Sequence, residues 1–124
     1  SLYVKALVVS KNLEKHAVQL YISNLVFLEV VTVLSQKRNR DVANRTGLYL
    51  LSDPRISHIY IDEQLHEESW GIFQNISQKN IGFIDCSIIA AMKAENISTL
   101  LTFDKTDFAV LQKQYRFSLY KDLV

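Results

Sequence analysis

The sequence is poor in the residues that form cross-links, flexible linkers and phosphate-binding loops. Its 124 residues include one cysteine, one proline and three glycines. A single cysteine excludes an internal disulfide, and so few glycines leave little room for a glycine-rich loop. No apolar run approaches the roughly 18 residues of a membrane span, and no signal peptide is visible. We therefore expect one soluble, cytoplasmic domain over residues 1–124, with no membrane partner.

The net charge of the chain is also close to zero. The 14 Lys and Arg residues balance 13 Asp and Glu residues, for a formal net charge of +1. Net charge therefore predicts no nucleic-acid partner, and only a local basic group could contact phosphates. The one candidate group is Lys37, Arg38, Arg40 and Arg45, for which a solvated helix face is the simpler interpretation.

The hydrophobic pattern predicts short strands that alternate with helices. Residues 2–9 fit either type of element, and a helix with the stripe Leu13, Ala17 and Leu20 follows. After it we expect four strands, at 21–23, 56–61, 99–103 and 117–120. Five helices are expected between and around them: one at 25–34 capped by Asn24, one that ends at about Leu51, one that follows the cap Asp62, one around Asp85 and one over 108–111. This alternation indicates an α/β fold with a largely parallel sheet.

Two acids stand in runs that are otherwise apolar. Asp85 lies between Phe83-Ile84 and Ile88-Ile89, and Glu29 shares residues 25–34 with a single other polar residue. We expect both to be buried, which costs several kcal/mol unless the carboxylate is paired, protonated or bound to a metal. No Lys or Arg occupies an equally apolar run. A protonated or hydrogen-bonded core acid is the alternative to a metal ligand.

Two more acids follow the predicted strand at 99–103. Asp104 comes where the strand ends, and Asp107 is close behind it. Open α/β sheets bind ligands beyond the carboxyl ends of their strands, and carboxylates suit Mg²⁺ or Mn²⁺. Such a metal supports phosphate chemistry, as in nucleases and phosphatases. A helix N-cap is the alternative role for each residue.

At these residues the chain resembles the PIN-domain family, and within it the small VapC-type ribonuclease toxins of toxin–antitoxin systems. The resemblance is carried by three motifs in order: ISNLVFLEV with Glu29, GFIDCSIIAAM with Asp85, and LLTFDKTDF with Asp104 and Asp107. It implies a three-layer sandwich, with a short, largely parallel sheet flanked by helices.

The resemblance also implies a Mg²⁺- or Mn²⁺-dependent endoribonuclease. Glu29, Asp85 and Asp104 would hold the metal, and Asp107 would orient water or a second ion. The implied partners are an RNA substrate, a cognate antitoxin protein and a second copy of the chain in a homodimer.

The chain departs from the family pattern at its start. The family's first acid ends a first strand, and the resemblance places that acid just before Ser1, so we expect the first strand to be missing. A catalytically inactive PIN-like binding module is the alternative function if the natural protein also lacks this acid. A second departure is Ile81-Gly82-Phe83, where the family often has Ser or Thr. Ser87 could substitute, although a hydroxyl bonded to its own helix is the simpler interpretation.

The remaining conspicuous side chains are assigned to the core. We expect Cys86 to pack as a small apolar residue, and Trp70, Phe73 and Tyr49 either to pack in the core or to line a groove for a partner helix. The three histidines have no metal-binding spacing and are given no chemical role.

Overall fold

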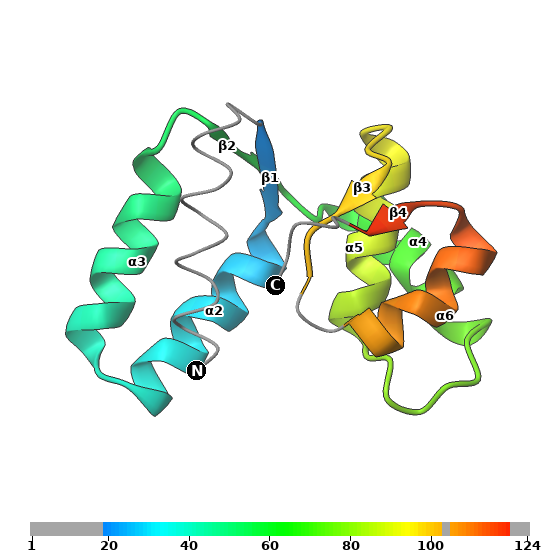
Figure 1. Cartoon of the computed structure of the whole chain (residues 1–124), viewed down its shortest axis with the longest axis horizontal. Helices are drawn as coiled ribbons and strands as arrows, with labels where there is room; N and C mark the ends of the chain where they lie inside the picture. The colour runs from blue at the N-terminus through cyan, green and yellow to red at the C-terminus, as the bar shows by residue number, and fades with distance from the viewer. Residues whose placement is uncertain (1–18, 103–104, 120–124) are drawn as a thin grey trace.

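The computed structural model describes residues 19–102 and 105–119, and only the backbone at 105–107. Strands and helices alternate within this range, as predicted (Figure 1). In chain order they are β1 (Leu20–Ser23), α2 (Asn24–Lys37), α3 (Arg40–Ser52), β2 (Ile56–Ile59), α4 (Glu63–Gln74), α5 (Phe83–Ala94), β3 (Thr99–Leu100), α6 (Lys105–Tyr115) and β4 (Ser118–Leu119). None of the described helices is long and apolar enough to cross a membrane.

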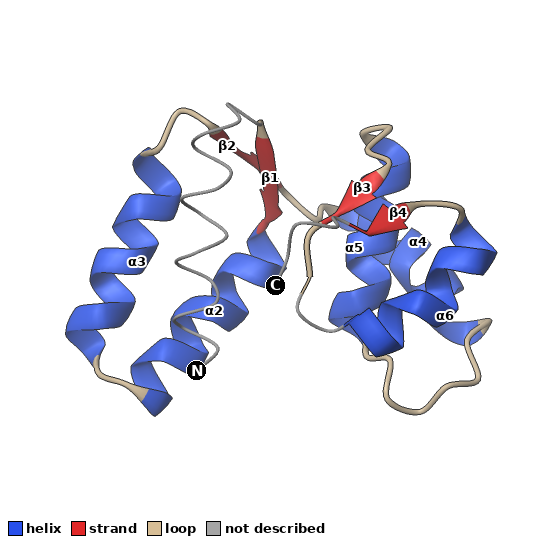
Figure 2. Cartoon of the chain, in the orientation of Figure 1, coloured by secondary structure: helices blue, strands red, loops and turns tan. Residues whose placement is uncertain are grey.

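The strands form two separate parallel pairs. β1 pairs with β2 in the register Leu20 to Ile56, and β3 pairs with β4 in the register Thr99 to Ser118. Helices α2 and α3 lie on one side of the strands and α4, α5 and α6 on the other (Figure 2). The predicted α/β fold with parallel pairing is confirmed. The predicted single sheet is two two-stranded sheets in the described part of the chain.

The N-cap of α2 differs from the predicted one, and the difference adds a hydrogen bond that anchors the helix. Ser23, not Asn24, is the N-cap, and its hydroxyl accepts from the Val26 N–H at 3.1 Å. The side chain of Asn24 instead accepts from the Ile61 N–H at 2.7 Å. Adjacent Ser and Asn both suit a cap, so local sequence could not choose between them. The second bond ties α2 to the segment after β2.

Other boundaries agree closely with the sequence. Asp62 caps α4 as predicted and accepts from the Leu65 N–H at 2.9 Å. Asn39 caps α3, so this helix begins after the basic residues at 37 and 38. Leu20, expected at the end of a helix, begins β1, and the remainder of that expected helix lies outside the described residues.

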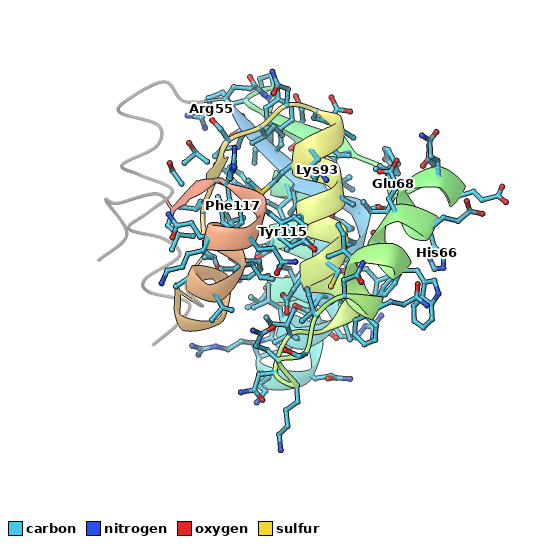
Figure 3. All side chains as sticks on the ribbon, turned by 90° about the vertical axis from the view of Figure 1, so that its right-hand side faces the viewer. Arg55, His66, Glu68, Lys93, Tyr115 and Phe117 are labelled. Atoms are coloured by element: carbon cyan, nitrogen blue, oxygen red, sulfur yellow. The ribbon has the colours of Figure 1, made fainter. Side chains whose placement is uncertain are left out.

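The core lies between α5, α6 and β4. Its buried residues are Ile81, Cys86, Ile89, Met92, Phe108, Leu111 and Phe117. Tyr115 and Phe117 lie alongside α5, and the Lys93 ammonium is 5.8 Å from the centre of the Tyr115 ring (Figure 3). Cys86 is fully buried in this cluster, which confirms its predicted packing role.

The burial predicted for α2 is wrong, and of the two alternatives for the large aromatic residues, packing in the core is not observed. None of the fourteen described residues of α2 is buried, and Leu28 is 62% exposed. Trp70 and Phe73 are 52% and 37% exposed, and Tyr49 is exposed as well. Apolar residues of these helices therefore remain at the surface, as is common in folded proteins.

Two helix glycines meet different surroundings. A Cβ added at Gly71 in α4 would have no atom within 4 Å, whereas one at Gly47 in α3 would lie 3.4 Å from Val31 Cγ2. We expect Gly71→Ala to raise the free energy of unfolding by about 0.5–1 kcal/mol, because alanine loses less backbone entropy in a helix. Urea unfolding measures the change. Gly47→Ala is the matched control and should gain less, and a destabilised Gly71→Ala protein would contradict the expectation.

Candidate functional site

Asp85 is held at the first turn of α5 by a backbone bond. The N-cap of this helix, Gly82, has no side chain, and its N–H donates to Asp85 Oδ2 at 3.0 Å. The Asp85 side chain is half-buried. A carboxylate is favoured here because the first turn of a helix carries the positive end of the helix dipole. Asp85 is therefore oriented by the backbone, at the edge of the core.

Cys86 and Ser87 follow Asp85 and have structural roles. The Ser87 hydroxyl donates to the Ile84 carbonyl at 2.6 Å. Ser87 therefore bonds to the backbone of its own helix, which was the simpler of its two interpretations. Burial raises the pKa of the Cys86 thiol, and the negative charge of Asp85 raises it further. A buried thiol with a raised pKa is a poor nucleophile.

We expect the folded protein to react slowly with iodoacetamide at pH 8. Cys86 has no exposed surface, so alkylation requires local opening. The rate should be on the order of 100-fold below that of the protein unfolded in guanidinium. Mass spectrometry of timed samples measures it. Equal rates in the folded and unfolded protein would contradict the burial of this thiol.

Glu29 is exposed, which corrects the prediction that it is buried. The cost of desolvation therefore does not argue for a metal ligand at this position. The position of Glu29 on α2 still favours a metal ligand, because α2 contacts α5, the helix that carries Asp85. Residues of both helices line an apolar groove.

Each acid is three residues from a residue that lines this groove. Val26 of α2 and Ile88 of α5 both line the groove. Glu29 comes three residues after Val26, and Asp85 comes three residues before Ile88. Residues three apart share a helix face. Glu29 therefore lies one turn beyond Val26 along α2, and Asp85 lies one turn before Ile88 along α5.

The other two candidate acids are only partly placed. Asp104 lies outside the described residues, and for Asp107 only the backbone is described, in the first turn of α6. Phe108, the next residue, belongs to the same buried cluster as Cys86. The residues next to Asp85 and Asp107 in the sequence therefore belong to one buried cluster.

The donor chemistry of the four acids fits a hard divalent cation. Carboxylate oxygens are the ligands that Mg²⁺ and Mn²⁺ prefer. Glu29 and Asp85 are the two whose side chains are described. Among the described side chains no three His, Cys, Asp or Glu residues form a metal-binding group, so these two alone do not complete a site.

The chain matches one protein family over most of its length. Residues 4–114 match the PIN domain, and this range contains all four candidate acids. The chain belongs to the PIN-domain family.

A solved structure has the same fold as this PIN domain. It is VapC20 of Mycobacterium tuberculosis, described as a toxin that cleaves the sarcin-ricin loop. The TM-score is 0.70 at 20% sequence identity, over 81% of this chain and 77% of the other. Comparison with curated protein sequences gives no significant match. The PIN fold predicted from the three motifs is therefore confirmed.

His58 and the basic group make contacts that are consistent with structural roles. His58 Nε2 lies 2.9 Å from the Leu50 carbonyl and links β2 to α3, a contact that the sequence did not indicate. Arg45 forms an ion pair with Asp41 at 3.0 Å, and both side chains are more than 70% exposed. This pair partly neutralises the basic group and is consistent with a solvated helix face.

Proposed function

We propose that this PIN domain is a metal-dependent endoribonuclease and the toxin of a toxin–antitoxin pair. The observation that carries the proposal is the contact between α2 and α5, the helices that carry Glu29 and Asp85. The PIN domain match and the fold shared with an RNA-cleaving toxin support it. An RNA substrate would place the protein in the cytoplasm.

Each acid has a proposed role. Asp85, oriented by the Gly82 N–H, and Glu29 would hold Mg²⁺ or Mn²⁺ together with Asp104, and Asp107 would orient the attacking water. The metal would supply water activation and stabilisation of the charge that develops on the phosphate. Glu29 is exposed, so its carboxylate is accessible from solution.

The proposal is tested by RNA cleavage with and without metal. Full-length protein should cut structured RNA in Mg²⁺ or Mn²⁺, and EDTA should abolish cleavage. A sarcin-ricin loop oligonucleotide belongs among the substrates, because VapC20 is described as cleaving that loop. Water attack predicts no 2′,3′-cyclic phosphate, which end-group analysis detects. Cleavage that survives EDTA, or products with cyclic phosphate, would contradict the metal-dependent mechanism.

The exposed aromatic face of α4 supports the proposed protein partners. Trp70 and Phe73 stack at the surface with ring centres 5.8 Å apart, and Phe73 lies 6.2 Å from Phe83 of α5. Exposed aromatic clusters of this kind are typical of protein interfaces. We propose that a cognate antitoxin or a second copy covers this face. An inactive binding module is the alternative if metal-loaded protein cuts no RNA but still binds a partner here.

A further inference from the structure

Three ring side chains form a stripe along the exposed side of α4. His66, Trp70 and Phe73 are spaced four and three residues apart, so they share one face of the helix. All three are exposed (Figure 3 labels His66), and the Trp70 and Phe73 rings stack with their centres 5.8 Å apart. Phe83 of α5 borders this α4 stripe, and its ring centre lies 5.2 Å from that of His66 and 6.2 Å from that of Phe73.

A row of acids runs beside the α4 stripe. Glu63 and Glu67 are four residues apart, and Glu67 comes three residues before Trp70, so these side chains are neighbours on the helix surface. Both acids are exposed, and no described Lys or Arg forms an ion pair with either of them. Residues 56–78 contain four acids and no Lys or Arg. Because the whole chain has a net charge of +1, this negative charge is local to α4.

The α4 stripe has the dimensions of a contact between two helices. His66 and Phe73 are seven residues apart, which is two turns or about 10 Å along the helix axis. A helix that packs on such a stripe presents apolar residues at the same spacing. The residues that flank its apolar side then lie over the acid row, where Lys or Arg would be complementary in charge.

We propose that the α4 stripe binds an amphipathic helix of a partner protein that carries Lys or Arg beside its apolar side. RNA bases also stack on exposed rings, but the neighbouring acids repel RNA phosphates. A symmetric dimer uses the same surface of both copies, so a second copy on this face would bring two acidic helices together. This inference rests on the protein partner proposed above for this face and is independent of the nuclease site.

The emission of Trp70 tests the proposal directly, because Trp70 is the only tryptophan of the chain. The probe is an amphipathic helical peptide of about 20 residues, with Leu on one side and Lys on the other. The control is the same peptide with Glu in place of Lys. The Lys peptide should shift the emission to shorter wavelength and bind at least about tenfold more tightly than the Glu peptide. Added salt should weaken its binding.

Variants show which side chains bind the Lys peptide. The double variant Glu63→Gln and Glu67→Gln should weaken binding about tenfold, because it removes both acids of the row. Glu95→Gln is the matched control, since it removes an exposed acid at the end of α5 and should change binding less than about twofold. Trp70→Ala, followed by anisotropy of a labelled peptide, should weaken binding about 30-fold. Circular dichroism checks that each variant is folded.

Several results would overturn the proposal. They are equal binding of the two peptides, unchanged emission of Trp70, and equal effects of the double variant and Glu95→Gln. A single-stranded RNA that quenches Trp70 in EDTA, or a dimer that Trp70→Ala dissociates, would assign the stripe to another occupant and overturn it too. Lys-peptide binding by a protein that cuts no RNA would count against the nuclease function alone. RNA cleavage by a protein that does not bind the Lys peptide would count against this inference alone.

Discussion

Asp85→Asn is expected to reduce metal-dependent RNA cleavage by at least about 100-fold. Asparagine keeps the size of the side chain and an oxygen that can accept from the Gly82 N–H, so α5 keeps its first turn. It removes the negative charge that would hold the metal. Metal binding supplies several kcal/mol of charge stabilisation, and each 1.36 kcal/mol changes the rate about tenfold. The measurement is the single-turnover cleavage rate at saturating Mg²⁺ or Mn²⁺.

The matched control is Asp62→Asn. Asp62 also starts a helix and also accepts from a backbone N–H, that of Leu65 at 2.9 Å, but it caps α4, which contributes none of its described residues to the lining of the groove. It should keep its cleavage rate within about twofold. Both variants should show unchanged circular dichroism. A folded Asp85→Asn protein that cuts RNA as fast as Asp62→Asn would remove Asp85 from the site.

Leu111→Ala is expected to lower the free energy of unfolding by about 3 kcal/mol. Leu111 in α6 is 1% exposed and packs in the buried cluster with Cys86 and Ile89. Truncation removes the buried methyl groups and leaves a cavity, for which 2–5 kcal/mol is typical. This is a large share of the roughly 5–15 kcal/mol that stabilises a small domain. Urea unfolding followed by circular dichroism measures it.

The neighbouring residue provides the control for this core prediction. Val110 is next to Leu111 on α6 but 43% exposed. Val110→Ala should change stability by less than about 0.5 kcal/mol, because alanine's better helix propensity offsets the small loss of burial. Similar losses in the two variants would mean that α6 does not dock on α5 as described.

The fold could be predicted from the sequence wherever neighbouring residues determine the local structure. Asp62 was assigned as a cap because an acid before an amphipathic run suits that position, and the helix around Asp85 followed from its apolar spacing. Burial was less predictable because it depends on neighbours that are distant in the sequence. The apolar run around Glu29 forms a helix, but none of the described residues of α2 is buried, and Glu29 is exposed.

The sequence predicts a set of candidate acids but not their geometry. Motif order indicated the family, which the domain match confirms, and made Glu29 and Asp85 candidates for its site. It did not indicate that Gly82 orients Asp85 through its N–H, because a glycine N-cap leaves no side-chain signal. It also gave no sign of a groove between β1 and β3. β3 has only two described residues in its ladder, too few to show a hydrophobic period.

Buried residues are unevenly shared between the two halves of the molecule. Six residues of α5 are buried, whereas α3 has two, Ala43 and Gly47, and α2 has none among its described residues. Segments with few buried contacts open at a lower free energy than the rest of a domain. The α2–α3 hairpin should therefore unfold locally while α5 and α6 stay folded. Glu29 is on the easily opened half and Asp85 on the resistant one, so a ligand that bridges the two acids would stiffen the hairpin.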